Sequence, residues 1–333
     1  MLKKASVIVP TKNPGGILRS VLAAVCNQKT DFDFDVLVID SGSTDGTVEF
    51  VRQFDDPRVR LHEIAPAEFG HGKTRNLGVS LTEGEFAVLI THDALPANEG
   101  WLAAMVRPAE QDPDVAGVFG RHLAYPDASP FTKRDLERHF SHFESTPVVS
   151  LDDRARYDRD PGYRQFLHFF SDNNALIRRS VWQQFPYPDV DFAEDQMWAE
   201  TVIKQGWKKA YAHDGVVFHS HDFPPFESMQ RSFDEAYALF RLFGYTLVPS
   251  LFRLVRAWAG ATWRDVRYAV QAGLIWRQPL AVLGMPWRNF MRSAGHYLGS
   301  RADRLPVGLR HRLSRDRRMM AGLTVSVRAE EKS

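Results

Sequence analysis

The junction at Asp40 constrains the fold of this chain more than any other feature of its sequence. Residues 36–39 form an uninterrupted run of apolar, mostly β-branched side chains, which is typical of a strand buried on both faces of a sheet. After Asp40 comes a loop rich in Ser, Gly and Thr, in which Asp45 is placed to cap a helix that begins near Thr47. Ligands of open α/β sheets bind beyond the carboxyl ends of the strands, so Asp40 is either a ligand contact or an ordinary turn acid.

The first 119 residues alternate between strand and helix patterns. Such alternation predicts an α/β fold with a mostly parallel sheet and right-handed crossovers. The region 120–180 contains four prolines and is predicted to consist largely of loops. We predict strands at 6–10, 36–40, 59–63, 86–90, 115–119, 175–177 and 215–219, and helices at about 14–28, 47–53, 73–81, 195–205 and 226–245.

The composition is that of an ordinary globular protein, with 44% hydrophobic and 25% charged residues among 333. A single cysteine, Cys26, excludes an internal disulfide framework and fits a reducing compartment. The N-terminal apolar run is too short for a secretory signal, and no segment approaches the roughly 18 apolar residues of a membrane span. We therefore expect a cytoplasmic protein.

Charge is distributed unevenly along the chain. Between Pro249 and Met319 there are 14 Arg, no Lys and 3 Asp, a net charge of +11, although the whole chain carries only +1. Four tryptophans lie among these arginines, and the pattern predicts several amphipathic helices. We therefore place a domain boundary near residue 224, with an α/β domain at 1–224 and a basic helical region at 225–333.

Three interpretations of the basic region remain open. It is a solvated helical cap, a peripheral contact with the anionic inner face of the plasma membrane, or a nucleic-acid surface. The acidic remainder of the chain and the abundance of Trp rather than Lys make nucleic acid the least favoured of the three, so we expect no nucleic-acid partner.

Polar side chains follow three of the predicted strands. Thr11 and Asn13 follow the first strand, Asp40 and Ser43 the second, and Asp93 the fourth. Because the carboxyl ends of parallel strands meet at one edge of a sheet, these side chains are expected to face a common crevice. We predict that Thr11, Asn13, Asp40 and Ser43 bind a ligand there.

A glycine-rich segment at residues 69–76 carries Lys73 and Arg75 at the start of a predicted helix. Its glycines would let backbone N–H groups approach an anion, and the two cations would add positive charge. A phosphate-loop ATPase is disfavoured because that motif requires Gly five positions before Gly72, where the chain has Ala67. We predict that Lys73 and Arg75 contact the phosphates of a ligand.

Asp93, His219 and His221 form a candidate metal site. A carboxylate at a strand end suits Mg²⁺ or Mn²⁺, with diphosphate oxygens completing the coordination, and imidazole ligands favour Mn²⁺. Two histidines separated by one residue at a strand end direct both rings to the same side. The alternatives are that Asp93 caps a helix and that one histidine is an ordinary surface residue.

Glu194 and Asp195 stand at the start of a predicted helix, where the helix dipole alone favours acids. Near a diphosphate site they are also candidates for a general base, because a carboxylate within hydrogen-bond reach of an acceptor hydroxyl can activate it for attack.

Together these motifs resemble the family 2 glycosyltransferases, which have the nucleotide-sugar-binding GT-A fold, and within that family the bacterial rhamnosyltransferases. The resemblance covers about residues 5–222, and the order of the motifs is more specific than any one of them. It is carried by the segments Phe69–Gly78, Thr91–Ala94, Gly120–Arg121, Ser171–Ala175, Ala193–Trp198 and Val217–His221.

The resemblance implies roles on the donor side of such a site. Thr11 and Asp40 would hold the nucleoside, with Asp40 accepting the N3–H of uracil or thymine, and Arg75 would lie near the base or the diphosphate. Asp93 occupies the last place of the family's Asp-x-Asp metal motif. The first place holds Thr91 instead, so a metal ion would receive only one carboxylate from that turn.

The resemblance also implies that His219 is a metal ligand, that Asp195 is the catalytic base and that Glu194 supports the acceptor. The reaction would move a sugar, rhamnose by this resemblance, with inversion. It would pass from a thymidine- or uridine-diphosphate donor to a hydroxyl of a glycan or lipid-linked acceptor during surface polysaccharide assembly. Two other classes remain open: a nucleotidyltransferase and a non-catalytic nucleotide-sugar-binding protein.

Overall fold

The computed structural model describes residues 3–190 and 192–315, and the chain divides into two compact units. The first unit comprises Met1–Asp189 and Glu194–His221, and the second comprises Val190–Ala193 and Asp222–Ser333. The boundary predicted at residue 224 lies three residues beyond the division after His221. Residues 316–333 of the predicted basic region fall outside the described residues.

The first unit is built on one mixed sheet, in the order β3-β2-β1-β4-β8-β6-β9-β5, with β7 paired to β9. Strands β1 to β4 run parallel, as do β6 and β9, so the expected mostly parallel sheet is confirmed. The described strands are β1 (Ala5–Thr11), β2 (Phe34–Asp40), β3 (Val59–Glu63), β4 (Phe86–Ile90), β5 (Leu95–Pro96), β6 (Val115–Leu123), β7 (Val148–Val149), β8 (Asn174–Arg178) and β9 (Lys208–Phe218).

Strand β8 runs antiparallel between β4 and β6, a reversal that the sequence patterns did not predict. Its first residue, Asn174, pairs with Ile90, the last residue of β4. The Asn174 side chain holds this position because it accepts from Trp101 Nε1 at 2.9 Å and donates to the Gly215 carbonyl at 2.8 Å. Residues just before β8 therefore lie at the edge where β4 ends.

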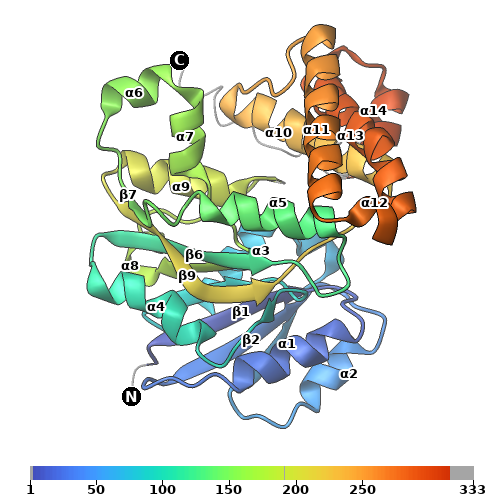
Figure 1. The fold of residues 1–333 in the computed structure, drawn as a ribbon. Helices are drawn as coiled ribbons and strands as arrows, with labels where there is room; N and C mark the ends of the chain where they lie inside the picture. The colour runs from blue at the N-terminus through green and yellow to red at the C-terminus, as the bar shows by residue number, and fades with distance from the viewer. Residues whose placement is uncertain (1–2, 191, 316–333) are drawn as a thin grey trace. The chain divides into compact units, whose positions relative to one another are not determined.

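Side chains alternate between the two faces of the sheet and fill two hydrophobic cores, as the period of a strand requires. Val7 and Val9 enter one core, which contains side chains of α1 (Ile17–Cys26), α2 (Thr47–Arg52) and α4 (Trp101–Gln111). Ile8 enters the other, with α3 (His71–Ser80), α5 (Pro130–Ser141), α8 (Arg179–Trp182) and α9 (Glu194–Lys204). These helices can be followed on the sheet in Figure 1.

The prediction that region 120–180 consists largely of loops is wrong. It contains α5, α6 (Arg154–Arg159) and α7 (Pro161–His168). Pro130 and Pro161 occupy the first turns of α5 and α7, and the side chains of Ser129 and Asp160 cap those helices. Proline suits the first turn because its missing N–H would have no partner there, so these prolines mark helix starts.

The second unit is helical, as predicted for the basic region. Its elements are α10 (Pro225–Phe243), α11 (Leu251–Gln271), α12 (Leu274–Arg277), α13 (Pro279–Gly299), the short turn Ala302–Arg304, and α14 (Val307–Leu313). Helix α13 approaches α10 closely at Gly299, where an added Cβ would lie 2.2 Å from the Phe233 carbonyl oxygen. Within the described residues, no helix is both long and apolar enough to cross a membrane.

Candidate active site

Thr11 and Asp40 end the neighbouring strands β1 and β2 in direct register. Asp40 is 1% exposed, and its Oδ1 accepts the N–H groups of Gly42 at 2.9 Å and Ser43 at 2.8 Å. Its Oδ2 and the Oγ1 of Thr11 are buried and have no hydrogen-bond partner among the described residues. Buried polar atoms are almost always paired, so these two oxygens are suited to the donor groups of a ligand.

Asn13 and Ser43 tie together the loops that follow β1 and β2. The Asn13 N–H donates to Ser43 Oγ at 2.8 Å, and Asn13 Oδ1 accepts the Thr44 N–H at 2.8 Å. Asp45 accepts the N–H and hydroxyl of Thr47 at the start of α2, although Gly46 occupies the N-cap itself. Asn13 and Ser43 thus shape the rim of the site, and their contact with a ligand stays a prediction.

The structure brings Asp93, His219 and His221 together at the ends of β4 and β9. Asp93 Oδ1 lies 3.6 Å from His219 Nε2, and Asp93 Oδ2 lies 3.2 Å from His221 Nε2. One donor atom from each of the three lies within 4.8 Å of the others. One carboxylate and two imidazoles are a suitable donor set for a divalent ion such as Mn²⁺.

The same neighbours control the ionisation of Asp93. Burial alone would raise its pKa, but the hydrogen bond to His221 and the charge of His219 outweigh that effect and lower the pKa below the usual range. Asp93 is therefore held as a carboxylate, the form that binds a cation.

Tyr125, which the sequence patterns did not predict as a site residue, contacts both of the chain segments that contribute to this trio. Its hydroxyl donates to the Asp93 carbonyl at 2.9 Å, and its N–H donates to Ser220 Oγ at 3.0 Å. Burial, with the nearby charge of Asp93, raises the pKa of Tyr125 to about 12, so the hydroxyl keeps its proton. Tyr125 follows β6 by two residues, and no sequence pattern connected it with Asp93.

One guanidinium and three carboxylates form a second, more deeply buried group. Arg75 is 6% exposed and forms ion pairs with Asp172, with 3.1 Å between Nε and Oδ2, and with Glu194. The Tyr187 hydroxyl donates to Asp172 Oδ1 at 2.7 Å. Asp195 is close by, since its Oδ2 lies 3.4 Å from the Asp172 backbone nitrogen, which donates to it. We call Arg75, Asp172, Glu194 and Asp195 the base cluster.

Burial raises the pKa of Asp195 well above its ordinary value, and the charges of Glu194 and Asp172 raise it further, whereas Arg75 opposes the shift. Burial likewise raises the pKa of Asp172 to about 6. A carboxylate whose pKa is raised toward neutrality is a better proton acceptor. The neighbours of Asp195 therefore make its carboxylate a stronger proton acceptor, and its role as a general base stays a prediction.

The glycine-rich segment packs differently from a phosphate loop. A Cβ at Gly72 would lie 2.3 Å from the Pro188 carbonyl oxygen, so this glycine allows α3 to pack on the loop 187–189. Arg75, predicted to contact a ligand's base or diphosphate, points instead into the base cluster. Lys73 is exposed, and its contact with phosphates stays a prediction.

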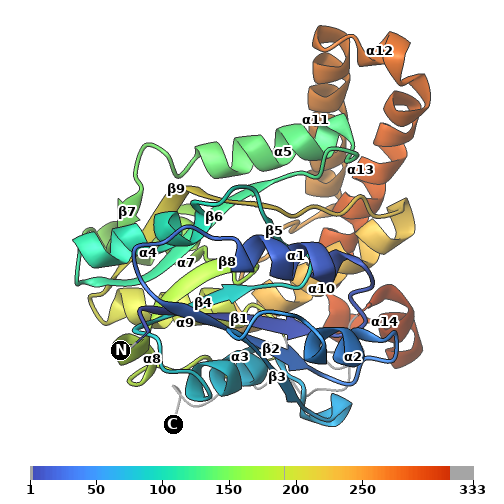
Figure 2. The same ribbon diagram turned by 90° about the horizontal axis from the view of Figure 1, so that it is seen from below.

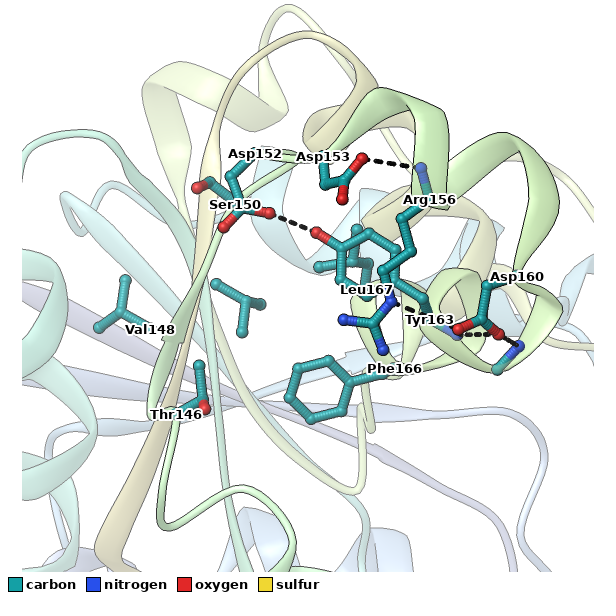
Figure 3. A pocket seen from close by; sticks show the side chains of 12 residues that line it. Thr146, Val148, Ser150, Asp152, Asp153, Arg156, Asp160, Tyr163, Phe166 and Leu167 are labelled. Atoms are coloured by element: carbon teal, nitrogen blue, oxygen red, sulfur yellow. Dashed lines mark hydrogen bonds and ion pairs between the residues drawn. The ribbon is translucent and has the colours of Figure 1, made fainter.

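A cavity of about 640 Å³ is lined by residues of β7, α6 and α7 (Figure 3) and lies at the opposite end of β9 from His219 and His221. Strand β7 pairs with residues 209–210 at the start of β9, whereas His219 follows the other end of that strand. The cavity's acids already have partners: Asp153 accepts the Arg156 N–H, Asp160 accepts the Tyr163 N–H, and Asp152 accepts the Tyr163 hydroxyl. They hold the starts of α6 and α7 in place.

The family described as glycosyl transferase family 2 matches residues 6–185, which is more than half of the chain. The chain belongs to glycosyl transferase family 2. It is therefore a glycosyltransferase, and the expected enzyme class is confirmed.

Two Salmonella proteins are similar to this family 2 glycosyltransferase over nearly their whole length. The O-antigen chain rhamnosyltransferase RfbN of Salmonella typhimurium is 31% identical over 308 residues, which cover 91% of this chain and 92% of that protein. The O-antigen chain rhamnosyltransferase WbaN of Salmonella anatum is 29% identical over 306 residues, 91% of each chain.

Solved structures agree on the fold. The mannosyltransferase PcManGT of Pyrobaculum calidifontis, determined with GDP-Man and Mn²⁺, aligns over 90% of this chain and 88% of its own with a TM-score of 0.59 and 20% identity. Residues 1–349 of Staphylococcus aureus TarS, determined with UDP, align over 90% and 91% with a TM-score of 0.50 and 18% identity. The predicted GT-A fold is confirmed.

Proposed function

We propose that this glycosyltransferase moves a rhamnosyl residue from a thymidine- or uridine-diphosphate donor to a hydroxyl of a glycan or lipid-linked acceptor in surface polysaccharide assembly. The observation that carries the proposal is the convergence, at one edge of the sheet, of an unpartnered Asp40 oxygen, the Asp93–His219–His221 trio and the base cluster. The similarity to two O-antigen chain rhamnosyltransferases supports the choice of sugar and process.

Asp40 and Thr11 would hold the nucleoside. Asp40 Oδ2 is an acceptor with no partner in the described chain, and a uracil or thymine ring offers an N3–H donor. The Oδ1 atom is already fixed by two backbone N–H groups, so the carboxylate is oriented before a ligand arrives. A preoriented acceptor loses little freedom on binding, which favours selectivity for the base.

Asp93, His219 and His221 would hold a divalent metal ion, Mn²⁺ or Mg²⁺. Such an ion supplies neutralising charge to the diphosphate that leaves. The trio fits this role because Asp93 is held ionised and both histidines direct Nε2 toward its carboxylate. Two of the three donors are imidazoles, which makes Mn²⁺ the better match.

Asp195 would accept the proton of the attacking hydroxyl. The acceptor oxygen forms a bond to the anomeric carbon, the bond from that carbon to the diphosphate breaks, and the configuration inverts. Glu194 supports the acceptor, and Arg75 keeps the carboxylates of the base cluster together by pairing with Asp172 and Glu194. Peripheral contact with the inner face of the plasma membrane belongs to the proposal, because a lipid-linked acceptor is held at a bilayer.

A donor panel tests the proposal. The full chain is incubated with Mn²⁺ and with thymidine-, uridine- or guanosine-diphospho-sugars, and release of nucleoside diphosphate is measured. We expect turnover of a thymidine- or uridine-diphosphate donor, with thymidine-diphospho-rhamnose the best. Turnover of guanosine donors alone would contradict the assignment of Asp40, and binding of donors without any turnover would favour a non-catalytic protein.

The nucleotidyltransferase alternative makes a different prediction for the same protein. It requires a nucleoside triphosphate and a sugar phosphate, and it releases pyrophosphate. Measuring pyrophosphate and nucleoside diphosphate in parallel therefore separates the two reactions.

A further inference from the structure

Helix α11 of the second unit has three different faces. Its packed face lies against α13, where Trp258 Nε1 donates to the Pro286 carbonyl at 2.8 Å and Asn289 donates to Asp265 Oδ2 at 2.6 Å. A second face is apolar yet exposed, and its members form one stripe because they lie 3, 11 and 18 residues after the first, close to whole numbers of helical turns. These exposed members are Phe252, Val255, Trp263 and Val270.

The third face of α11 is basic. Three of its four arginines directly follow a member of the apolar stripe and the fourth lies three residues beyond the third, so a row of guanidinium groups runs beside the stripe. The arginines are Arg253, Arg256, Arg264 and Arg267. All four are exposed, and none forms an ion pair with a carboxylate in the part of the chain that the structure describes.

The apolar stripe continues on α12 and α13. Trp276 is 87% exposed and Leu280 is 83% exposed, and Leu283 and Trp287 follow at the helical spacing. Figure 2 shows α12 at the turn that joins α11 to α13. On both α11 and α13, the rotation about the helix axis that leads from the packed face to the apolar stripe has the same sense, viewed along the chain direction. In an antiparallel pair, this places both stripes on one side of the hairpin.

Charge in this hairpin is almost entirely positive. Residues 251–299 contain seven arginines, no lysine and a single acid, Asp265. Asp265 is buried and accepts the hydrogen bond from Asn289, so it does not offset the arginines at the surface. An apolar stripe rich in Trp and Leu beside a row of arginines matches the chemistry of an anionic membrane surface.

We propose that the hairpin formed by α11, α12 and α13 docks on an anionic lipid bilayer. Trp263, Trp276 and Leu280 would enter the headgroup layer, and the arginines would contact lipid phosphates. Indole rings are favoured at this depth because one end is apolar and the other can donate a hydrogen bond. The helices would lie in the plane of the interface.

A second copy of the chain fits this surface less well. A symmetric dimer places the same patch of both copies in one interface. The arginine rows of the two copies would then face each other without carboxylates to separate them, and opposed like charges disfavour association.

This inference rests on the proposed function in one respect, because a lipid-linked acceptor would be presented at such a bilayer. It goes further by naming the surface that meets the lipid. Vesicle binding and donor hydrolysis are measured separately, so either proposal can fail alone. Hydrolysis without vesicle binding overturns the docking surface, and vesicle binding without hydrolysis overturns the enzymatic proposal.

The test uses the full chain and sedimentation with vesicles. Vesicles of phosphatidylcholine alone are compared with vesicles that also contain phosphatidylglycerol, at low and high salt. We expect binding to the anionic vesicles, weakened by salt because the arginine contacts are screened. Equal binding to both vesicle types, or no binding to the anionic vesicles at low salt, overturns the proposal.

Two double variants separate the basic and apolar contributions. Arg264→Glu with Arg267→Glu is expected to weaken binding by about 25-fold or more, at about fivefold for each arginine lost. Trp276→Ala with Leu280→Ala is expected to weaken it by about 10- to 100-fold through lost apolar burial. All four side chains are exposed, so the second unit should fold normally, as circular dichroism can verify.

The control variants carry the same kinds of substitution at exposed positions outside the hairpin. Arg107→Glu with Arg138→Glu changes the net charge equally on exposed positions of the first unit, and Phe226→Ala removes an exposed apolar side chain from α10. Both controls should leave vesicle binding unchanged. If they weaken binding as much as the hairpin variants do, or if sedimentation velocity shows that the hairpin variants abolish a dimer instead, the assignment is wrong.

Discussion

Asp93 and Asp195 lie in the same unit and belong to the same proposed site, but they have different neighbours. Asp93 faces the imidazoles of His219 and His221, whereas Asp195 lies among the carboxylates of Asp172 and Glu194. Both are half-buried, and burial raises the pKa of each. The neighbours account for the difference, because those of Asp93 outweigh burial and lower its pKa, whereas the acids beside Asp195 add to the effect of burial.

This difference supports the two proposed roles without reference to any motif. A carboxyl that ionises easily suits a cation, and one whose pKa is raised is a stronger proton acceptor once it is ionised. Arg75 reduces the difference between the two pKa values, because it is the cation that pairs with two acids of the base cluster. Substitutions that remove either carboxylate, or one of its charged neighbours, therefore test the two proposed roles.

Replacing Asp195 should remove the proposed general base. Asp195→Asn keeps the shape of the side chain but cannot accept a proton, so kcat is expected to fall by about 10²- to 10⁴-fold. Donor affinity, measured by calorimetry, should be unchanged. The control is Glu200→Gln on the same helix, whose carboxylate pairs with Lys204 and should not affect kcat. Near-normal turnover by Asp195→Asn would rule out this base.

Replacing Asp93 should instead weaken the proposed metal site. Asp93→Asn removes the anionic donor, and metal-dependent turnover is expected to fall by about 10²- to 10³-fold because a bound ion supplies several kcal/mol of charge stabilisation. Titration of activity with Mn²⁺ and the electron paramagnetic resonance signal of bound Mn²⁺ measure the loss.

His213→Ala serves as its control, since that histidine lies on β9 but pairs with Glu144 instead of Asp93. A metal requirement that stays the same in Asp93→Asn would exclude Asp93 from the metal site.

The pH profile of kcat/KM tests the electrostatics of the base cluster. A raised pKa keeps Asp195 protonated, and thus inactive, up to a higher pH, so activity should fall about tenfold for each pH unit below that pKa. Asp172→Asn removes a neighbouring negative charge and should shift the acid limb to lower pH. Arg75→Met removes the opposing cation and should shift it to higher pH.

Arg75→Met also leaves buried acids without a partner and is expected to cost about 3–5 kcal/mol of stability, measured by urea unfolding. Arg75→Lys keeps the positive charge and is the folded control. Shifts of the same sign in Asp172→Asn and Arg75→Met would contradict the electrostatic account.

The smallest expected effect concerns Tyr125. Tyr125→Phe removes the hydroxyl that binds the Asp93 carbonyl, and metal affinity is expected to fall by about tenfold, as is usual for groups that orient metal ligands. Calorimetry with Mn²⁺ measures it. Tyr163→Phe, which removes a hydroxyl bonded to Asp152 in the separate cavity, should leave metal affinity unchanged.

Much of the site could be predicted from the sequence because parallel strands bring their carboxyl ends to one edge. That rule alone placed Thr11, Asp40 and Asp93 together, although they are far apart along the chain, whereas His219 and His221 were added as candidate metal ligands. The helices of region 120–180 were missed because proline was interpreted as a loop signal, whereas Pro130 and Pro161 begin helices.

The base cluster could not be predicted from spacing. Its ion pairs join α3, the segment before β8 and the start of α9, and no local pattern reports which carboxylates a buried guanidinium will meet. The one available signal was the segment Ser171–Ala175, which contributed to the resemblance without a role for Asp172. Gly72 was similarly ambiguous, because close packing and anion binding both favour glycine.

The reversed direction of β8 has a consequence for how such a site can diversify. Most strands of the sheet have their site residues just after the strand ends, whereas Asp172 lies just before β8 begins. The segment between α7 and β8 can therefore change in length or sequence and reposition Asp172 and the acids beside it, where we propose that the acceptor binds. The loops that carry Asp40 and Asp93 leave other strands and would stay as they are. Under the proposed roles, acceptor preference and nucleotide preference can thus evolve separately on one sheet.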